Sequence, residues 1–143
     1  MSKHQQTGMR GVYLVAAELA GHGLIVSPTS RSAIGADLLV TNDKCDKAFS
    51  VQVKTNAKVS NSWLTGEKAQ NISAPSHIYV FVNLDKGGKH EFFVVPSKFV
   101  AANVKVSDRK TSIWYSFSKE MAGKFRSKWS VLGAEVDGEV SSA

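Results

Sequence analysis

The sequence predicts a single α/β (α+β) domain in which helices flank a central mixed β-sheet. One observation is an apolar stripe at helical spacing between Met9 and about Gly21. A second is a series of short strand-like segments separated by turn-forming residues. The third is that no repeat, low-complexity stretch or linker divides the 143 residues. We therefore expect one domain over residues 1–143, with flexible ends at residues 1–8 and 134–143.

The elements are expected in a definite order along the chain. A helix over residues 9–21 begins it, because Val12, Val15, Ala16 and Leu19 share one face and Gly21 supplies a stop signal. Strands are predicted over residues 24–28, 36–42 and 48–56, the last two as a hairpin around the polar connector 43–47. The polar residues 57–76 hold at most a short helix at 67–72.

The second half of the chain is expected to add two strands over 77–84 and 90–96, joined by a turn at DKGGK. A short helix over 97–104 follows, with Ser97 as its cap, then a strand over 112–118 and a basic helix over 118–129. Large aromatic side chains most often fill cores, so we expect Trp114 and Trp129 to be buried. Trp63 lies in a polar stretch, where either burial or base stacking is open.

The composition suits a soluble protein that meets polyanions. The formal net charge is +6 and the pI is about 9.5, which makes nucleic acid a plausible partner, although many soluble proteins are mildly basic. The basic side chains crowd the last third of the chain, where they could hold a DNA backbone without reading its sequence; they are Lys98, Lys105, Arg109, Lys110, Lys119, Lys124, Arg126 and Lys128.

Several classes of protein are disfavoured. No apolar run approaches the roughly 20 residues of a membrane-spanning helix, and the polar start MSKHQQTG lacks the apolar centre of a secretory signal. We therefore expect no membrane partner and an intracellular, cytoplasmic location. The lone Cys45 and the four scattered histidines offer neither an intramolecular disulfide nor zinc-ligand spacing.

The strand FSVQVKT carries a polar face. Because side chains alternate along a strand, Ser50, Gln52 and Lys54 share the face opposite the apolar residues. Asp37 begins the neighbouring strand, and a hairpin brings it beside that face. A carboxylate and a carbonyl oxygen suit a hard divalent ion such as Mg²⁺, while the ammonium group can orient water and offset charge on a phosphate. This chemistry is phosphodiester hydrolysis.

The same residues carry a resemblance to a known family. Glu18 in VAAELAG, Asp37 in SAIGADLLV, and Gln52 and Lys54 in FSVQVKT resemble the pattern of the PD-(D/E)xK nuclease superfamily, in its QxK variant, over about residues 9–100. The resemblance implies a restriction-endonuclease-like core and cleavage of DNA with Mg²⁺, or with Mn²⁺ in its place. It implies that Asp37, Gln52 and Glu18 hold the metal and that Lys54 aids the water and the transition state. By analogy, an enzyme this small that cuts both strands of a duplex would act as a homodimer.

One residue departs from the family's usual pattern. Gln52 stands where an acid is usual, so the site loses a negative charge, and metal affinity should fall unless Glu18 replaces it. The alternative function is therefore a catalytically inactive nuclease-fold module that binds DNA or a protein partner. Taken singly, Glu18 could be a helix former, Asp37 a turn residue and Lys54 a charge on an edge strand.

Four further polar residues are candidates for contact with the nucleic acid because they lie close to the predicted site in sequence; they are Ser32, Thr55, Asn56 and Lys58. Polar residues of this kind in loops and at strand ends also occur without any function.

Overall fold

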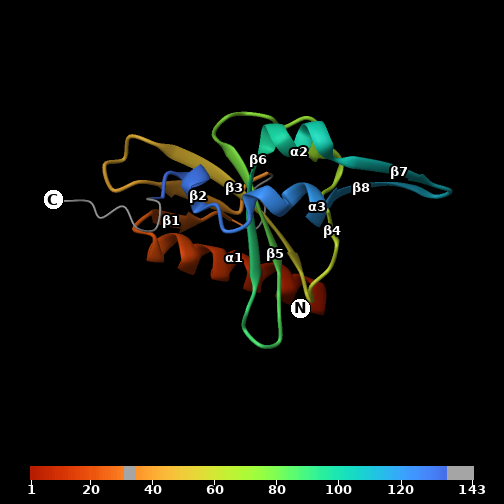
Figure 1. Cartoon of the computed structure of the whole chain (residues 1–143), viewed down its shortest axis with the longest axis horizontal. Helices are drawn as coiled ribbons and strands as arrows, with labels where there is room; N and C mark the ends of the chain where they lie inside the picture. Colours follow the sequence, from red (N-terminus) through yellow and green to blue (C-terminus); the bar gives the residue numbers. More distant parts are fainter. Residues whose placement is uncertain (31–34, 135–143) are drawn as a thin grey trace.

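The structure is a computed structural model that describes residues 1–30 and 35–134 (Figure 1). Its centre is a five-stranded sheet with the order β1-β2-β3-β5-β6. Strand β3 runs parallel to β5, and the other neighbouring pairs are antiparallel. The predicted mixed sheet is therefore confirmed; its strands are β1 (Ile25–Pro28), β2 (Leu38–Thr41), β3 (Ala48–Asn56), β5 (His77–Asn83) and β6 (Glu91–Pro96).

Helix α1 (Lys3–Gly21) covers one face of this sheet and buries Val15 and Leu19 against it. The helix begins earlier than expected, so residues 3–8 are not a flexible end. The reason is a capping box: the Ser2 hydroxyl accepts a hydrogen bond from the Gln5 backbone N–H at 3.1 Å, and the Gln5 side chain accepts one from the Ser2 backbone in return. These bonds satisfy donors that the first turn would otherwise leave unpaired.

The opposite face of β5 and β6 is covered by α2 (Ser97–Asn103) and by a second sheet with the order β4-β8-β7. Figure 1 shows α1 and α2 on opposite sides of the central sheet. The strands of the second sheet are β4 (Ser62–Leu64), β7 (Lys105–Arg109) and β8 (Ser112–Ser118). Of these, only β8 was predicted from the sequence. A one-turn 3₁₀ helix, η1 (Glu67–Gln70), confirms the short helix expected near residue 67.

The three tryptophans divide between core and surface. Trp63 is 2% exposed, and its Nε1 donates a hydrogen bond to the Val82 carbonyl at 2.9 Å. Trp129 is 7% exposed, as expected. Trp114 is 40% exposed, so the prediction that it fills the core is wrong. Strand β8 extends past β4 at this point, so Trp114 belongs to neither core cluster of the described residues and is covered in part by Arg109.

The basic helix predicted over residues 118–129 is interrupted. It consists of α3 (Lys119–Ala122), η2 (Gly123–Phe125) and η3 (Trp129–Leu132). Phe125 packs into the cluster beneath α2, whereas Trp129 packs into the cluster beneath α1. A continuous helix would place residues four apart on one face, so the chain instead extends at Arg126 and crosses the edge of β6, where the Ser127 N–H donates to the Phe92 carbonyl at 2.8 Å.

Two smaller features concern the ends of elements. Pro96, not Ser97, occupies the cap position of α2; the buried Ser97 hydroxyl donates to the Ala74 carbonyl at 3.2 Å and so ties α2 to the loop before β5. At the carboxyl end, Ala134 is buried in the core, whereas residues 135–143 lie outside the described part of the chain. No helix among the described residues is both long enough and apolar enough to cross a membrane.

Candidate active site

Asp37 is fixed at the edge of β3, just before β2 begins. Its backbone N–H donates to the Val51 carbonyl at 2.7 Å, and its Oδ2 accepts a hydrogen bond from the Val53 backbone N–H at 2.8 Å. The paired register of β2 and β3 ends where Leu38 faces Val51, so the Val53 N–H has lost its strand partner. The carboxylate takes that partner's place. Asp37 is therefore held by the main chain of the strand that carries Gln52 and Lys54.

Gln52 lies where two hollows meet. On one side it lines a hollow of about 420 Å³ together with Asp37, the end of β1 and the first half of α1. On the other side it lines a hollow of about 220 Å³ together with Lys54, which we call the Lys54 hollow. The pairing of Leu38 with Val51 sets Asp37 beside Gln52 across the two strands. The structure thus brings Asp37, Gln52 and Lys54 together on one part of the sheet, as expected.

Lys54 is partly buried, and burial lowers the pKa of its ammonium group below the usual value. The negative charge of Asp37 acts in the opposite direction and raises that pKa, but less than burial lowers it. A cation in this setting is poorly hydrated. It can therefore act more strongly on a nearby negative charge than a solvated lysine can.

Glu18 is not brought to this site. The part of α1 that lines the hollow beside Asp37 lies in its first half and comprises Gln5, Gly8, Met9, Val12 and Tyr13. Glu18 is exposed near the other end of the helix, about 9 Å farther along the axis than Val12 and about 240° around it. The expectation that Glu18 would replace the charge missing at Gln52 is corrected by this geometry: the helical phase places Glu18 on a different face.

Without Glu18, Asp37 and Gln52 are the predicted oxygen ligands that remain at the site, and they make up only part of a coordination shell for Mg²⁺. Within the described residues, no group of three His, Cys, Asp or Glu side chains lies close enough to hold a metal ion. Asp37 supplies one carboxylate and Gln52 one carbonyl oxygen. Magnesium commonly takes one or two carboxylates and completes its shell with water and substrate phosphate. The residues therefore fit an ion that is shared with a phosphate better than one held by the protein alone.

The four residues predicted to contact nucleic acid lie in different surroundings. Ser32 lies outside the described residues. The Thr55 hydroxyl is buried against Gly11 of α1 and has no hydrogen-bond partner among the described residues, so a contact with phosphate is not supported. The Asn56 Nδ2 donates to Asn83 Oδ1 at 2.9 Å and to the Ser62 carbonyl at 2.8 Å, which tie β3 to its neighbours. Lys58 is exposed.

The structure adds residues that sequence reasoning missed. Tyr79 is the parallel-strand partner of Gln52 and lines the Lys54 hollow. Burial raises the pKa of Tyr79, so its phenol remains a neutral O–H group. Glu67 and Lys68 reach the same hollow from η1. Alternation within HIYVFVN predicts which residues share a face with Tyr79, but only the long-range pairing of β3 with β5 shows that this is the face of Gln52. For Glu67 and Lys68, the polar segment 57–76 has no sequence pattern that predicts their position near Lys54.

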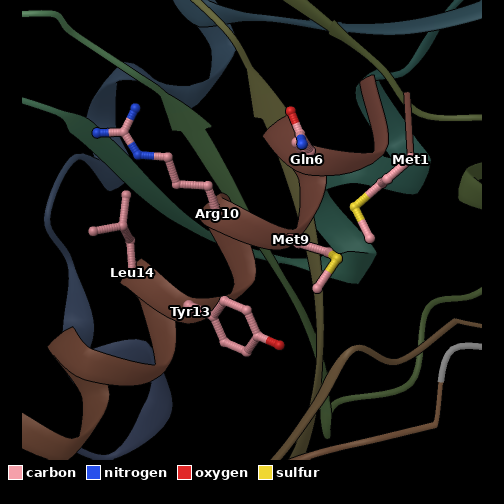
Figure 2. A pocket seen from close by; sticks show the side chains of 6 residues that line it. All are labelled: Met1, Gln6, Met9, Arg10, Tyr13 and Leu14. Carbon is pink, nitrogen blue, oxygen red and sulfur yellow. The ribbon is translucent and has the colours of Figure 1, made fainter. Parts of the chain in front are cut away.

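A separate hollow of about 410 Å³ lies on the outer surface of α1 (Figure 2). Figure 2 shows Met9 and Tyr13 projecting from one side of the helix, with Arg10 and Leu14 on another. Its lining holds one charged side chain, Arg10, and no carboxylate. Without a carboxylate, this lining suits a divalent metal ion less well than the site around Asp37 does.

Comparisons with known proteins agree with this fold. No protein-family model and no curated protein matches the sequence. Among solved structures, that of Archaeoglobus fulgidus Hjc, a Holliday junction resolvase from an archaeal hyperthermophile, matches with a TM-score of 0.58 and 10% identity over 90% of this chain and 98% of that chain. The structure of the bacterial homing endonuclease I-Ssp6803I matches with a TM-score of 0.59 and 14% identity over 90% of each chain. Together with the strand order, these matches show that the chain has a restriction-endonuclease-like fold.

Proposed function

We propose that this protein is a metal-dependent endonuclease that hydrolyses phosphodiester bonds in DNA. The observation that carries the proposal is the attachment of the Asp37 carboxylate to the Val53 N–H, beside Gln52 and within electrostatic reach of Lys54. An acid, a carbonyl oxygen and a poorly hydrated cation then border two adjoining hollows that a phosphate can enter.

Each residue has its own role in the proposed reaction. Asp37 and Gln52 would hold Mg²⁺, with Mn²⁺ as a substitute, and the bound ion would polarise the phosphate. Lys54 would orient the attacking water and stabilise the negative charge that develops on the phosphate oxygens. The backbone bond to Val53 fixes the Asp37 side chain, so little reorganisation is needed when the substrate binds.

Cleavage of supercoiled plasmid tests the proposal directly. The protein should nick or linearise the plasmid with Mg²⁺ or Mn²⁺ and should give no product with chelator. Asp37→Asn and Lys54→Met should each lower the rate by roughly 100-fold or more, since each removes a charge that acts in the transition state. Lys44→Met is the matched control, because Lys44 is exposed in the hairpin between β2 and β3 and lies outside both hollows.

A second candidate is a nuclease-fold module that binds DNA or a protein partner without cutting. Two observations favour it: an amide at Gln52 in place of an acid, and the position of Glu18 away from the hollow. Salt-sensitive DNA binding without any metal-dependent product, on plasmid, duplex and single-stranded substrates alike, would support this candidate over the nuclease. Sedimentation with and without DNA would test the expected homodimer in either case.

A further inference from the structure

Strands β7 and β8 form a two-stranded ribbon that extends away from the body of the molecule (Figure 1). Strand β8 is paired on its other side with β4 only from Ser116 to Ser118. Beyond Ser116 the ribbon therefore stands without a third strand, and side chains on both of its faces are exposed, among them Val106, Ile113 and Trp114. The fold gives these side chains no core to fill.

The two faces of the ribbon differ in charge. The register pairs Lys105 with Ser116, Ser107 with Trp114, and Arg109 with Ser112. Because side chains alternate along a strand, these residues share one face, which we call the basic face. Asp108, the only acid of the ribbon, pairs with Ile113 on the opposite face. The basic face thus carries two cations, hydroxyl groups and an aromatic ring without a carboxylate, and Lys110 adds a third cation at the turn.

Trp114 is held in a defined orientation on the basic face. Its Nε1 donates to the Ser112 hydroxyl at 2.7 Å, and the Arg109 guanidinium lies 4.6 Å from the ring centroid. These contacts limit the rotamers of an exposed side chain, which lowers the entropy lost when a ligand stacks on it. An exposed tryptophan beside cations is a typical platform for an unpaired nucleobase.

The ribbon is continuous with the proposed active site. A hollow of about 510 Å³ at the unpaired edge of β8 is lined by Trp114 and shares Gly66 and Glu67 with the Lys54 hollow. A chain that leaves Lys54 and passes over Gly66 therefore reaches Trp114 directly.

We propose that the basic face of the β7–β8 ribbon binds a single-stranded segment of the substrate that flanks the scissile phosphate. Trp114 stacks on an unpaired base, and Lys105, Arg109 and Lys110 contact the phosphates. Charge complementarity favours nucleic acid, and the exposed ring favours a single strand, because the bases of a duplex are already stacked on one another. The inference deepens the proposed function, since it presumes that the chain acts on nucleic acid.

The test measures binding in chelator, so that it does not depend on cleavage. Fluorescence anisotropy of labelled oligothymidylate and of a blunt duplex would be compared for the parent, Trp114→Ala and Val106→Ala. Loss of the stacked base should weaken single-strand binding by about 5- to 150-fold, with a change of less than about twofold for the duplex. Val106→Ala is the matched control, because it removes an exposed apolar side chain from the opposite face of the ribbon and lies outside the hollow that Trp114 lines.

A second measurement guards against misfolding of the alanine variant. Trp63 and Trp129 are buried, so quenching of the parent's tryptophan fluorescence by oligothymidylate should report mainly Trp114. Trp114→Phe should retain most of the affinity and lose most of the quenching. Arg109→Gln should weaken binding and reduce the slope of log K against log salt by about 1.

Three results would overturn the inference: equal losses for Trp114→Ala and Val106→Ala, an equal loss on duplex and single strand, or no quenching in the parent. These outcomes are separable from a failure of the proposed function. If the protein binds oligothymidylate through Trp114 but never cleaves DNA, the proposed nuclease function is wrong and the proposed binding site on the ribbon still holds. If the protein cleaves DNA but its affinity for oligothymidylate does not depend on Trp114, the nuclease function holds and the binding site on the ribbon is wrong.

Discussion

Gly11 of α1 lies directly over Thr55 of β3, and a Cβ at Gly11 would overlap the Thr55 hydroxyl. This close approach sets the distance between the helix and the strand that carries Gln52 and Lys54. The same approach buries the Thr55 hydroxyl, which has no partner in residues 1–30 and 35–134, and the packing of α1 on the sheet must offset that cost. The site therefore depends on a helix that supplies no catalytic acid to it.

Gly11→Ala should destabilise the protein by about 1–3 kcal/mol, because the added methyl group forces α1 away from β3. The intrinsic gain of alanine over glycine in a helix, about 1 kcal/mol, opposes this loss without cancelling it. Gly8→Ala is the control: apart from the helix's own backbone and the adjacent residues, no atom of the described residues lies within 4 Å of a Cβ there, so that variant should be more stable than the parent. Urea unfolding of the three proteins measures the order, and a Gly11→Ala variant as stable as Gly8→Ala would contradict the close approach.

Lys54→Met should abolish cleavage and yet stabilise the protein at neutral pH. Burial lowers the Lys54 pKa in the folded state, so the unfolded chain binds the proton more tightly and the folded state is penalised while the group is charged. The free energy of unfolding of the parent therefore increases as pH rises from the folded pKa towards 10.5, the unfolded value. The stability advantage of Lys54→Met should therefore shrink between pH 7 and pH 10, in denaturant midpoints. A constant difference across that range would argue against a desolvated lysine.

Gln52→Glu should strengthen metal binding, because it places a second carboxylate beside Asp37. We expect the Mg²⁺ concentration for half-maximal cleavage to fall on the order of tenfold. Without metal the variant should be less stable than the parent, since two carboxylates then repel each other. Cleavage rates against Mg²⁺ concentration measure the first effect and thermal unfolding in chelator the second. Gln52→Ala, which removes the oxygen ligand, should move the Mg²⁺ requirement in the other direction.

Glu91→Gln should remove stability at neutral pH but not in acid. Burial raises the pKa of Glu91. Hydrogen bonds from Lys119 and Asn83 and the charges of Lys119 and Arg126 lower the pKa by more, so it lies below its usual value. A carboxyl group of this kind stabilises the fold above its unfolded pKa, and the contribution is lost as pH falls through the folded pKa.

The expected loss for Glu91→Gln at pH 7 is about 1–3 kcal/mol, since Lys119 loses its 2.9 Å ion pair beneath α3. Unfolding of parent and variant from pH 7 to pH 2 should show the two curves converging. The exposed Glu120, also on α3, gives the control Glu120→Gln, which should differ little from the parent at any pH. Curves that stay parallel down to pH 2 would exclude the ionised network around Glu91.

Much of the site follows from short stretches of sequence. Alternation within residues 48–56 predicts the bounds of β3 and the shared face of Gln52 and Lys54, because the period of a strand is local. The hairpin to β2 brings Asp37 alongside, since two strands joined by a short connector pair with each other. The mixed sheet follows from the order of the apolar segments.

Long-range packing decided the rest. Glu18 shares a helix with residues that line the hollow, but its distance from Asp37 depends on the phase in which α1 lies on β3, and Gly11 and Thr55 set that phase through contact. Trp63 and Trp114 both lie in strands of the second sheet, and only the extent of pairing between β4 and β8 leaves one buried and the other exposed. The sequence by itself determined which side chains share a strand face, because that depends on neighbouring residues; the tertiary structure determined which faces meet, because burial is the joint property of segments far apart in the chain.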